Sequence, residues 1–367
     1  MTSGWRQPYA QLKEFVSEHP EIEIGEKIVR IPEAPRAQFY VLFDKIGSAL
    51  LHQDLPDIFP ETARLAKSFS EAKGELSTRL GMVQISASHG LERFLDDPQA
   101  SLMAELFDLT LDLVKGRASP EAFEDAASRK ADAFSQRFYR MGYEKWVEMS
   151  VTGLLDPDRV LCVPLPKISI VKKFKTMSPL KHKVPRPKDK SDLILEREVF
   201  PIFTTPDFIV HSARLRKFAS LATEIVDPAW GASNASRRRK WYQVAPIRAE
   251  LAASGGWPDI SVYVSRWASD LSLVTDTISV ARPDLIIECN ELEERREQDI
   301  EKAKLEHRVL KPKLGTFIVS RGLVSKKEGT ELGDGIRLLA VGFDRTKLRP
   351  IVEALSGSKK ARRSLSS

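Results

Sequence analysis

Residues 275–290 read TDTISVARPDLIIECN, and this stretch decides the fold class. Apolar and polar residues alternate before Arg282-Pro283-Asp284, which is a typical turn sequence, and the apolar run Leu285-Ile286-Ile287 follows it. The stretch therefore predicts a β-hairpin. One face of the first strand carries Asp276, and one face of the second carries Glu288 and Asn290. If these faces match, the carboxylates of Asp276 and Glu288 converge.

The sequence on both sides of this stretch predicts a compact α/β domain. Alternating or apolar runs rich in β-branched residues indicate strands at residues 260–264, 271–274, 277–280, 285–287, 315–320 and 336–341. Helical spacing and charge indicate helices at residues 237–251, 291–310 and 347–355. Further upstream, strands are expected at residues 197–203 and 208–210, and residues 214–225 fit either a helix or a strand.

The first half of the chain has a different pattern. Apolar residues recur at helical spacing over residues 36–156, and glycine is sparse there. Ser119-Pro120-Glu121 predicts a helix start, with serine as the cap and proline at the first helical position. This half is therefore expected to be mostly helical.

A basic, proline-rich stretch separates the two halves. Between residues 167 and 190 lysine and arginine dominate and Asp189 is the single acid, so we expect a linker or an extended arm. Lys172, Lys173 and Lys175 would contact phosphates if the stretch is an arm, whereas a solvated connector would need no partner. The expected domains are residues 1–160, 161–192 and 193–355, followed by a basic disordered tail at 356–367.

Composition excludes several classes of protein. The 367 residues carry a net charge of +6, which permits a polyanionic partner. No apolar run is long enough to span a membrane and the start lacks the layout of a secretory signal, so a cytoplasmic protein is expected. Cys162 and Cys289 are far apart and are expected to be buried apolar residues. The six histidines show no zinc-site spacing, so any metal would need carboxylate ligands.

The order of elements around Glu288 resembles the PD-(D/E)XK, or restriction-endonuclease-like, nuclease superfamily. A helix, two strands, a strand with Glu288-Cys289-Asn290, another helix and two more strands follow one another over residues 237–341. The resemblance implies a mixed-sheet core flanked by helices. It also implies that Asp276 and Glu288 bind Mg²⁺ or Mn²⁺, since hard cations take oxygen ligands.

The sequence departs from the family pattern at one position. Asn290 stands where the family has a lysine that orients or activates the attacking water. An amide can orient a water but carries no charge. Lys302 or Lys304 could take the place of this lysine. Gln298 lies where members of the family sometimes have a polar site residue, and Glu250 could be an additional acidic ligand. Pro206-Asp207 is a lesser candidate for the PD element.

The function expected from these features is a metal-dependent endonuclease or exonuclease, a hydrolase acting on DNA. Asp276, Glu288 and Asn290 would form its catalytic site. The basic helix start at Arg237, Arg238, Arg239 and Lys240 would grip phosphates, because a helix dipole disfavours cations there. The alternatives are a nuclease-like domain that has lost catalysis and binds nucleic acid or protein, and an unrelated α/β interaction protein.

Overall fold

The chain divides into two compact units, each made of two segments. The computed structural model describes residues 4–25, 28–162, 188–189, 192–195, 208–223, 258–271, 283–290, 297–322 and 331–357. The first unit contains Met1–Lys67 and His89–Gly142, and the second contains Ser68–Ser88 and Tyr143–Ser367. This division differs from the boundary expected at residue 160, because residues 68–88 and 143–160 group with the sheet.

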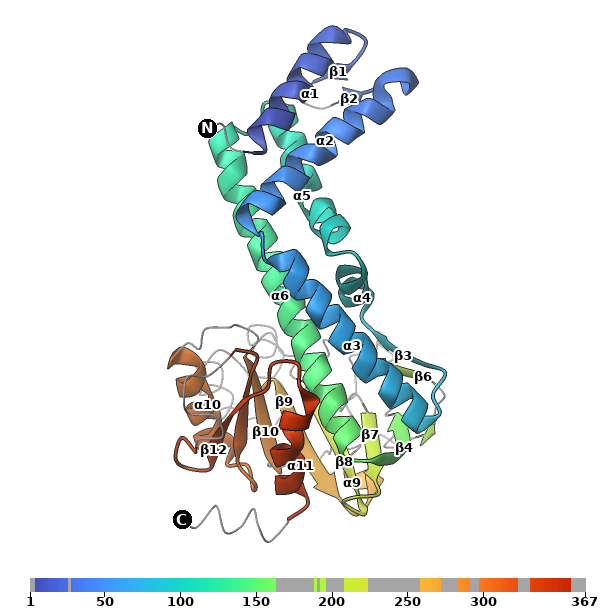
Figure 1. Cartoon of the computed structure of the whole chain (residues 1–367), viewed down its shortest axis with the longest axis vertical. Helices are drawn as coiled ribbons and strands as arrows, with labels where there is room; N and C mark the ends of the chain where they lie inside the picture. The colour runs from blue at the N-terminus through green and yellow to red at the C-terminus, as the bar shows by residue number, and fades with distance from the viewer. Residues whose placement is uncertain are drawn as a thin grey trace, which may run out of the picture. The chain divides into compact units, whose positions relative to one another are not determined.

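Helices make up most of the first unit, as the sequence predicted (Figure 1). The described helices that lie wholly in it are α1 (Arg6–Glu18), α2 (Glu33–Asp54), α4 (His89–Asp96) and α5 (Pro98–Val114). Two longer helices, α3 (Ile58–Leu80) and α6 (Pro120–Leu154), contribute residues to both units. A short antiparallel pair, β1 (Glu23–Ile24) and β2 (Val29–Arg30), joins α1 to α2.

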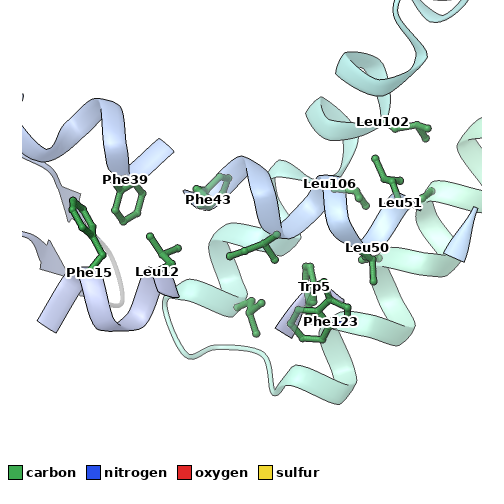
Figure 2. Close-up of a cluster of buried hydrophobic side chains, with 14 of the residues drawn as sticks. Trp5, Leu12, Phe15, Phe39, Phe43, Leu50, Leu51, Leu102, Leu106 and Phe123 are labelled. Atoms are coloured by element: carbon green, nitrogen blue, oxygen red, sulfur yellow. The ribbon is translucent and has the colours of Figure 1, made fainter. Parts of the chain in front are cut away.

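Aromatic and leucine side chains fill the core of this unit, as Figure 2 shows. Trp5 is fully buried and packs edge-on against Phe123, with 5.0 Å between the ring centroids. The predicted start of α6 is confirmed: the Ser119 hydroxyl accepts a hydrogen bond from the backbone N–H of Ala122 at 3.2 Å. This bond satisfies one of the amide groups that a helix start leaves open.

The second unit is built on a mixed sheet. Within the described residues it has eight strands in the order β12-β11-β10-β9-β8-β7-β4-β5. These strands are β4 (Pro157–Cys162), β5 (Lys188–Asp189), β7 (Phe208–Ser212), β8 (Lys217–Thr223), β9 (Ile260–Ser265), β10 (Leu285–Asn290), β11 (Thr316–Ser320) and β12 (Ile336–Ala340). β10, β11 and β12 are parallel, and the other neighbours are antiparallel. A separate parallel pair joins β3 (Gln84–Ala87) to β6 (Asp192–Leu195).

Helices flank this sheet, which makes the second unit an α/β structure. Helix α10 (Glu297–Leu310) connects β10 to β11 and packs against β10, β11 and β12 (Figure 1). Ala303 on α10 belongs to one buried cluster with Ile318, Ile336 and Leu338 of the sheet. The other described elements are α9 (Ala268–Leu271), η2 (Arg345–Leu348) and α11 (Arg349–Leu355). No helix in the described part of the chain is both long and apolar enough to cross a membrane.

The last turns of α6 are buried even at charged positions. Lys145 and Glu148 are 2% and 0% exposed, and their side chains form an ion pair at 2.9 Å. Tyr143 and Trp146 on the same helix pack edge-on against Phe343, which follows β12. This part of α6 therefore belongs to the core of the sheet unit.

The predicted strands at residues 208–210, 260–264, 285–287, 315–320 and 336–341 are confirmed as β7, β9, β10, β11 and β12, and the ambiguous stretch forms β8. The predicted hairpin is wrong at Leu285–Ile287. A strand has two edges, and these residues of β10 pair with β9 on one side while β11 occupies the other. Leu271, expected to begin a strand, ends α9 instead.

Candidate functional site

One face of β10 lies along α10 and carries polar side chains. The predicted alternation is confirmed by its contacts: Ile286 packs against Leu310, while Glu288 and Asn290 meet polar side chains of α10. Residues late in the helix face the start of the strand, so α10 runs antiparallel to β10. This arrangement brings helix side chains to Glu288.

Glu288 is 5% exposed and is held by donors from two other elements. Its Oε1 accepts a hydrogen bond from the backbone N–H of Asp259 at 3.2 Å, and its Oε2 accepts one from Lys302 Nζ at 2.7 Å. The strand register explains the first contact. Ile287 pairs with Ile260, so the residue before β9 lies beside the residue that follows Ile287.

The side chain of Asp259 in turn binds the backbone of β10. Its Oδ2 accepts a hydrogen bond from the backbone N–H of Cys289 at 2.7 Å, and its side chain is 3% exposed. Lys302 Nζ lies 3.5 Å from Asp259 Oδ1. The reciprocal backbone bonds therefore hold two carboxylates side by side where β9 begins next to β10, and the ammonium of Lys302 lies near both.

Glu306 adds a third carboxyl group to this site. It lies four residues after Lys302 on α10, with Oε1 at 3.6 Å from Lys302 Nζ, and it is fully buried. Among the residues that the structure describes, neither oxygen of Glu306 receives a hydrogen bond. We call Asp259, Glu288, Lys302 and Glu306 the carboxylate–lysine cluster.

Burial and crowding of charge shift the pKa values in this cluster. Burial raises the pKa of Glu288, and the neighbouring charge of Asp259 raises it further, while Lys302 opposes both. Burial and the charge of Glu288 raise the pKa of Glu306 to about 11. Burial alone would lower the pKa of Lys302, but the surrounding carboxylates raise it above its ordinary value. These shifts keep Lys302 charged at neutral pH and favour the protonated form of Glu306.

Asn290 is engaged with the first turns of α10. Its Nδ2 donates a hydrogen bond to Asp299 Oδ2 at 2.8 Å, and the residue is 5% exposed. Asp299 precedes Lys302 by one turn. The bond therefore ties α10 to the end of β10 next to the carboxylate–lysine cluster.

The structure brings together only some of the predicted site residues. Glu288 and Asn290 lie on β10 as expected, and Cys289 on the same strand is buried, also as expected. Lys304 pairs with Glu301 on the exposed side of α10, and Gln298 is exposed. The remaining candidates lie outside the described residues: Asp276, Glu250, Asp207, Lys172, Lys173, Lys175, Arg237, Arg238, Arg239 and Lys240.

Sequence reasoning missed Asp259 and Glu306. A signal for Asp259 existed, since Pro258-Asp259 immediately precedes the alternating run of β9. The spacing of Lys302 and Glu306 places both on one face of the predicted helix. The similar Pro283-Asp284 starts β10 at its other end, where Asp284 accepts bonds from the Val264 N–H and from Lys313.

The part of the chain that the structure describes contains no group of three or more Asp, Glu, His or Cys side chains arranged to hold a metal ion. In the carboxylate–lysine cluster, the ammonium of Lys302 lies among the three carboxyl groups. Two carboxylates, of Asp259 and Glu288, are adjacent, and Mg²⁺ sites often use one or two protein carboxylates with waters and phosphates.

Comparisons of the chain with protein-family models, with curated proteins and with solved structures found no match. Similarity therefore assigns neither a family nor an activity. The function has to be inferred from the side chains that β9, β10 and α10 bring together.

Proposed function

We propose that the chain is a metal-dependent nuclease of the PD-(D/E)XK type that hydrolyses phosphodiesters in DNA. One observation carries the proposal: neighbouring strands hold the carboxylates of Asp259 and Glu288 side by side, and a lysine from the next helix reaches both. The order β10, α10, β11 and β12 also supports it, because the resemblance implies a strand with the acidic motif, a helix and two strands.

In this proposal Asp259 takes the role of the motif aspartate. It belongs to a Pro-Asp pair, it directly precedes a strand, and its backbone binds the Glu288 carboxylate. Asp276, to which the sequence assigned that role, lies outside the described residues and stays a prediction. Glu288 keeps its role as the acid of the second motif.

The adjacent carboxylates of Asp259 and Glu288 are oxygen ligands of the kind that a hard divalent cation takes. Asp259, Glu288 and Glu306 present three carboxyl groups against the single ammonium of Lys302, so the cluster has an excess of oxygen donors and of negative charge. Asp259 and Glu288 would hold Mg²⁺ or Mn²⁺ there. When bound, such an ion supplies Lewis-acid stabilisation of a phosphate and a water of lowered pKa.

The lysine absent from position 290 is supplied from α10 in this proposal. Lys302 and Lys304 were equal candidates by sequence, but only Lys302 reaches Glu288. Its charge, on a flexible side chain that can leave the metal-binding oxygens, would stabilise negative charge that develops on a phosphate oxygen. Asn290 would position α10 through Asp299 instead of contacting the reacting water.

Metal-dependent cutting of plasmid and single-stranded DNA tests the proposal. Glu288→Gln and Asp259→Asn each remove an anionic ligand, so each should slow cutting by at least about two orders of magnitude, the scale of losing one electrostatic contributor. Asp284→Asn is the matched control, since it changes an aspartate at the other end of β10 and keeps an acceptor for the Val264 N–H. Its rate should stay within about threefold of the unsubstituted protein.

Cutting that persists in Glu288→Gln, or in a chelator, would refute the proposal. The second candidate function is a nuclease-like domain without catalysis that binds nucleic acid or protein. The ion pair of Lys302 with Glu288 favours it, because buried carboxylates paired with lysine need no metal. DNA binding by the protein and its variants with no cutting in Mg²⁺ or Mn²⁺ would favour this second function.

A further inference from the structure

Lys302 stands where a cation between Asp259 and Glu288 would stand. Its Nζ lies 2.7 Å from Glu288 Oε2 and 3.5 Å from Asp259 Oδ1. Building on the proposed function, we propose that Lys302 is an internal counter-ion of the metal site, which a divalent cation must displace before the site can act. The metal and the ammonium would exchange at the same carboxylate oxygens.

The charges and the limited space in the site explain why the metal and the Lys302 ammonium would exchange. Asp259 and Glu288 are almost fully buried, so without a metal their charges need a cation close by, and Lys302 provides it. A divalent cation bound to the same oxygens would lie within a few ångströms of the ammonium. Like charges repel strongly at such separations in a buried site, so both cations cannot occupy it together.

Glu306 provides a place for the displaced ammonium. It lies one turn further along α10, it is fully buried, and none of the described residues donates a hydrogen bond to its carboxyl oxygens. The Lys302 side chain is 19% exposed and flexible, and its Nζ already lies 3.6 Å from Glu306 Oε1. A small movement toward Glu306 would therefore free Glu288 and give this buried carboxyl group a donor.

Binding of Mn²⁺ to the full chain, measured by isothermal titration calorimetry, tests the exchange. Lys302→Met removes the competing cation and keeps a similar stem, so it should bind Mn²⁺ at least about tenfold more tightly than the unsubstituted protein. Lys302→Arg keeps the charge and should bind no more tightly. Lys304→Met is the matched control, because Lys304 pairs with exposed Glu301, and it should leave the affinity unchanged.

The outcomes separate this inference from the proposed function. If the unsubstituted protein binds Mn²⁺ through Glu288 and cuts DNA, but Lys302→Met binds no more tightly, the exchange is wrong and the nuclease stands. If neither protein binds Mn²⁺, both ideas fail.

Thermal unfolding shows whether a variant fails to bind Mn²⁺ because it is unfolded. In chelator, Lys302→Met should melt at a lower temperature than the unsubstituted protein. Mn²⁺ should raise the melting temperature of Lys302→Met more than that of the unsubstituted protein. If Lys302→Met and Lys302→Gln both stay unfolded in Mn²⁺, a metal cannot replace the ammonium, and the inference is overturned.

Discussion

At the scale of single residues, Glu306 shows how a buried acid is tolerated. It is fully buried and lies near Glu288, so ionising it would place two like charges together in a site of low dielectric constant. Its raised pKa means that the folded protein keeps a proton that the unfolded chain releases. Stability should therefore depend on pH through this residue.

We expect Glu306→Gln to flatten the pH dependence of stability in metal-free protein. The folded pKa of Glu306 is raised from 4.5 to about 11, so between these values the folded state binds the extra proton. The free energy of unfolding then falls as pH rises, by at most about 1.4 kcal/mol per pH unit for one group. Denaturant unfolding in chelator at about pH 6 and about pH 9 should show a smaller fall for Glu306→Gln, by about 1 kcal/mol or more.

Glu301→Gln is the control for this measurement, because Glu301 lies on the exposed side of the same helix. It should keep the pH dependence of the unsubstituted protein. An equal fall in stability for Glu306→Gln and the unsubstituted protein would mean that Glu306 is ionised in the folded state.

At the scale of elements, the turn before β11 depends on glycine. Gly315 has a φ of +103°, and a Cβ on it would collide with the carbonyl oxygen of Gly335, which accepts the Thr316 N–H bond at 3.0 Å. Residues 315 and 335 precede β11 and β12, so this close approach brings the starts of the two parallel strands together.

Gly315→Ala should therefore destabilise the sheet unit by about 2 kcal/mol or more, combining backbone strain with a steric clash. Gly333→Ala is a matched control: Gly333 also has a positive φ, of +92°, but no atom of the described residues lies within 4 Å of where its Cβ would be. Its cost should be limited to about 1 kcal/mol of backbone strain. Denaturation midpoints, followed by circular dichroism, measure the loss of stability in both variants. Equal losses of stability would show that the contact with Gly335 is unimportant.

The elements themselves could be predicted from sequence, but their pairing could not. Alternation and apolar runs are local properties, and they located β9, β10, β11 and β12. Pairing is not local: the turn sequence Arg282-Pro283-Asp284 favoured a neighbouring strand, whereas β10 pairs with β9. The ion pair of Glu288 with Lys302 depends on how α10 lies across β10, and helical periodicity alone does not fix that direction.

At the scale of the whole molecule, the net charge of +6 bears on whether the protein binds DNA, as proposed. If Lys172, Lys173 and Lys175 contact phosphates, DNA affinity should fall steeply with salt. Reversing all three to Glu should reduce the slope of log K against log salt concentration by about 3, since each phosphate contact contributes about 0.9. Fluorescence anisotropy with a labelled duplex, from about 50 mM to about 200 mM salt, gives the slope.

A matched triple reversal of Lys13, Lys45 and Lys67, which are all exposed in the first unit, changes the net charge equally. It should leave most of the slope in place. If the two triple variants bind alike, the basic stretch is a connector and not a phosphate-contacting arm.

Each unit is made of two separate segments of the chain, and this determines which parts can fold first during synthesis. Residues 68–88 belong with the sheet, and β3 within them pairs with β6, yet the ribosome makes all of residues 89–142 before that partner. The helical unit can close once residue 142 has emerged, while β3 must wait for Asp192–Leu195. In the nascent chain β3 therefore has no partner strand until Leu195 has been made, and an unpaired strand edge is a surface to which chaperones can bind.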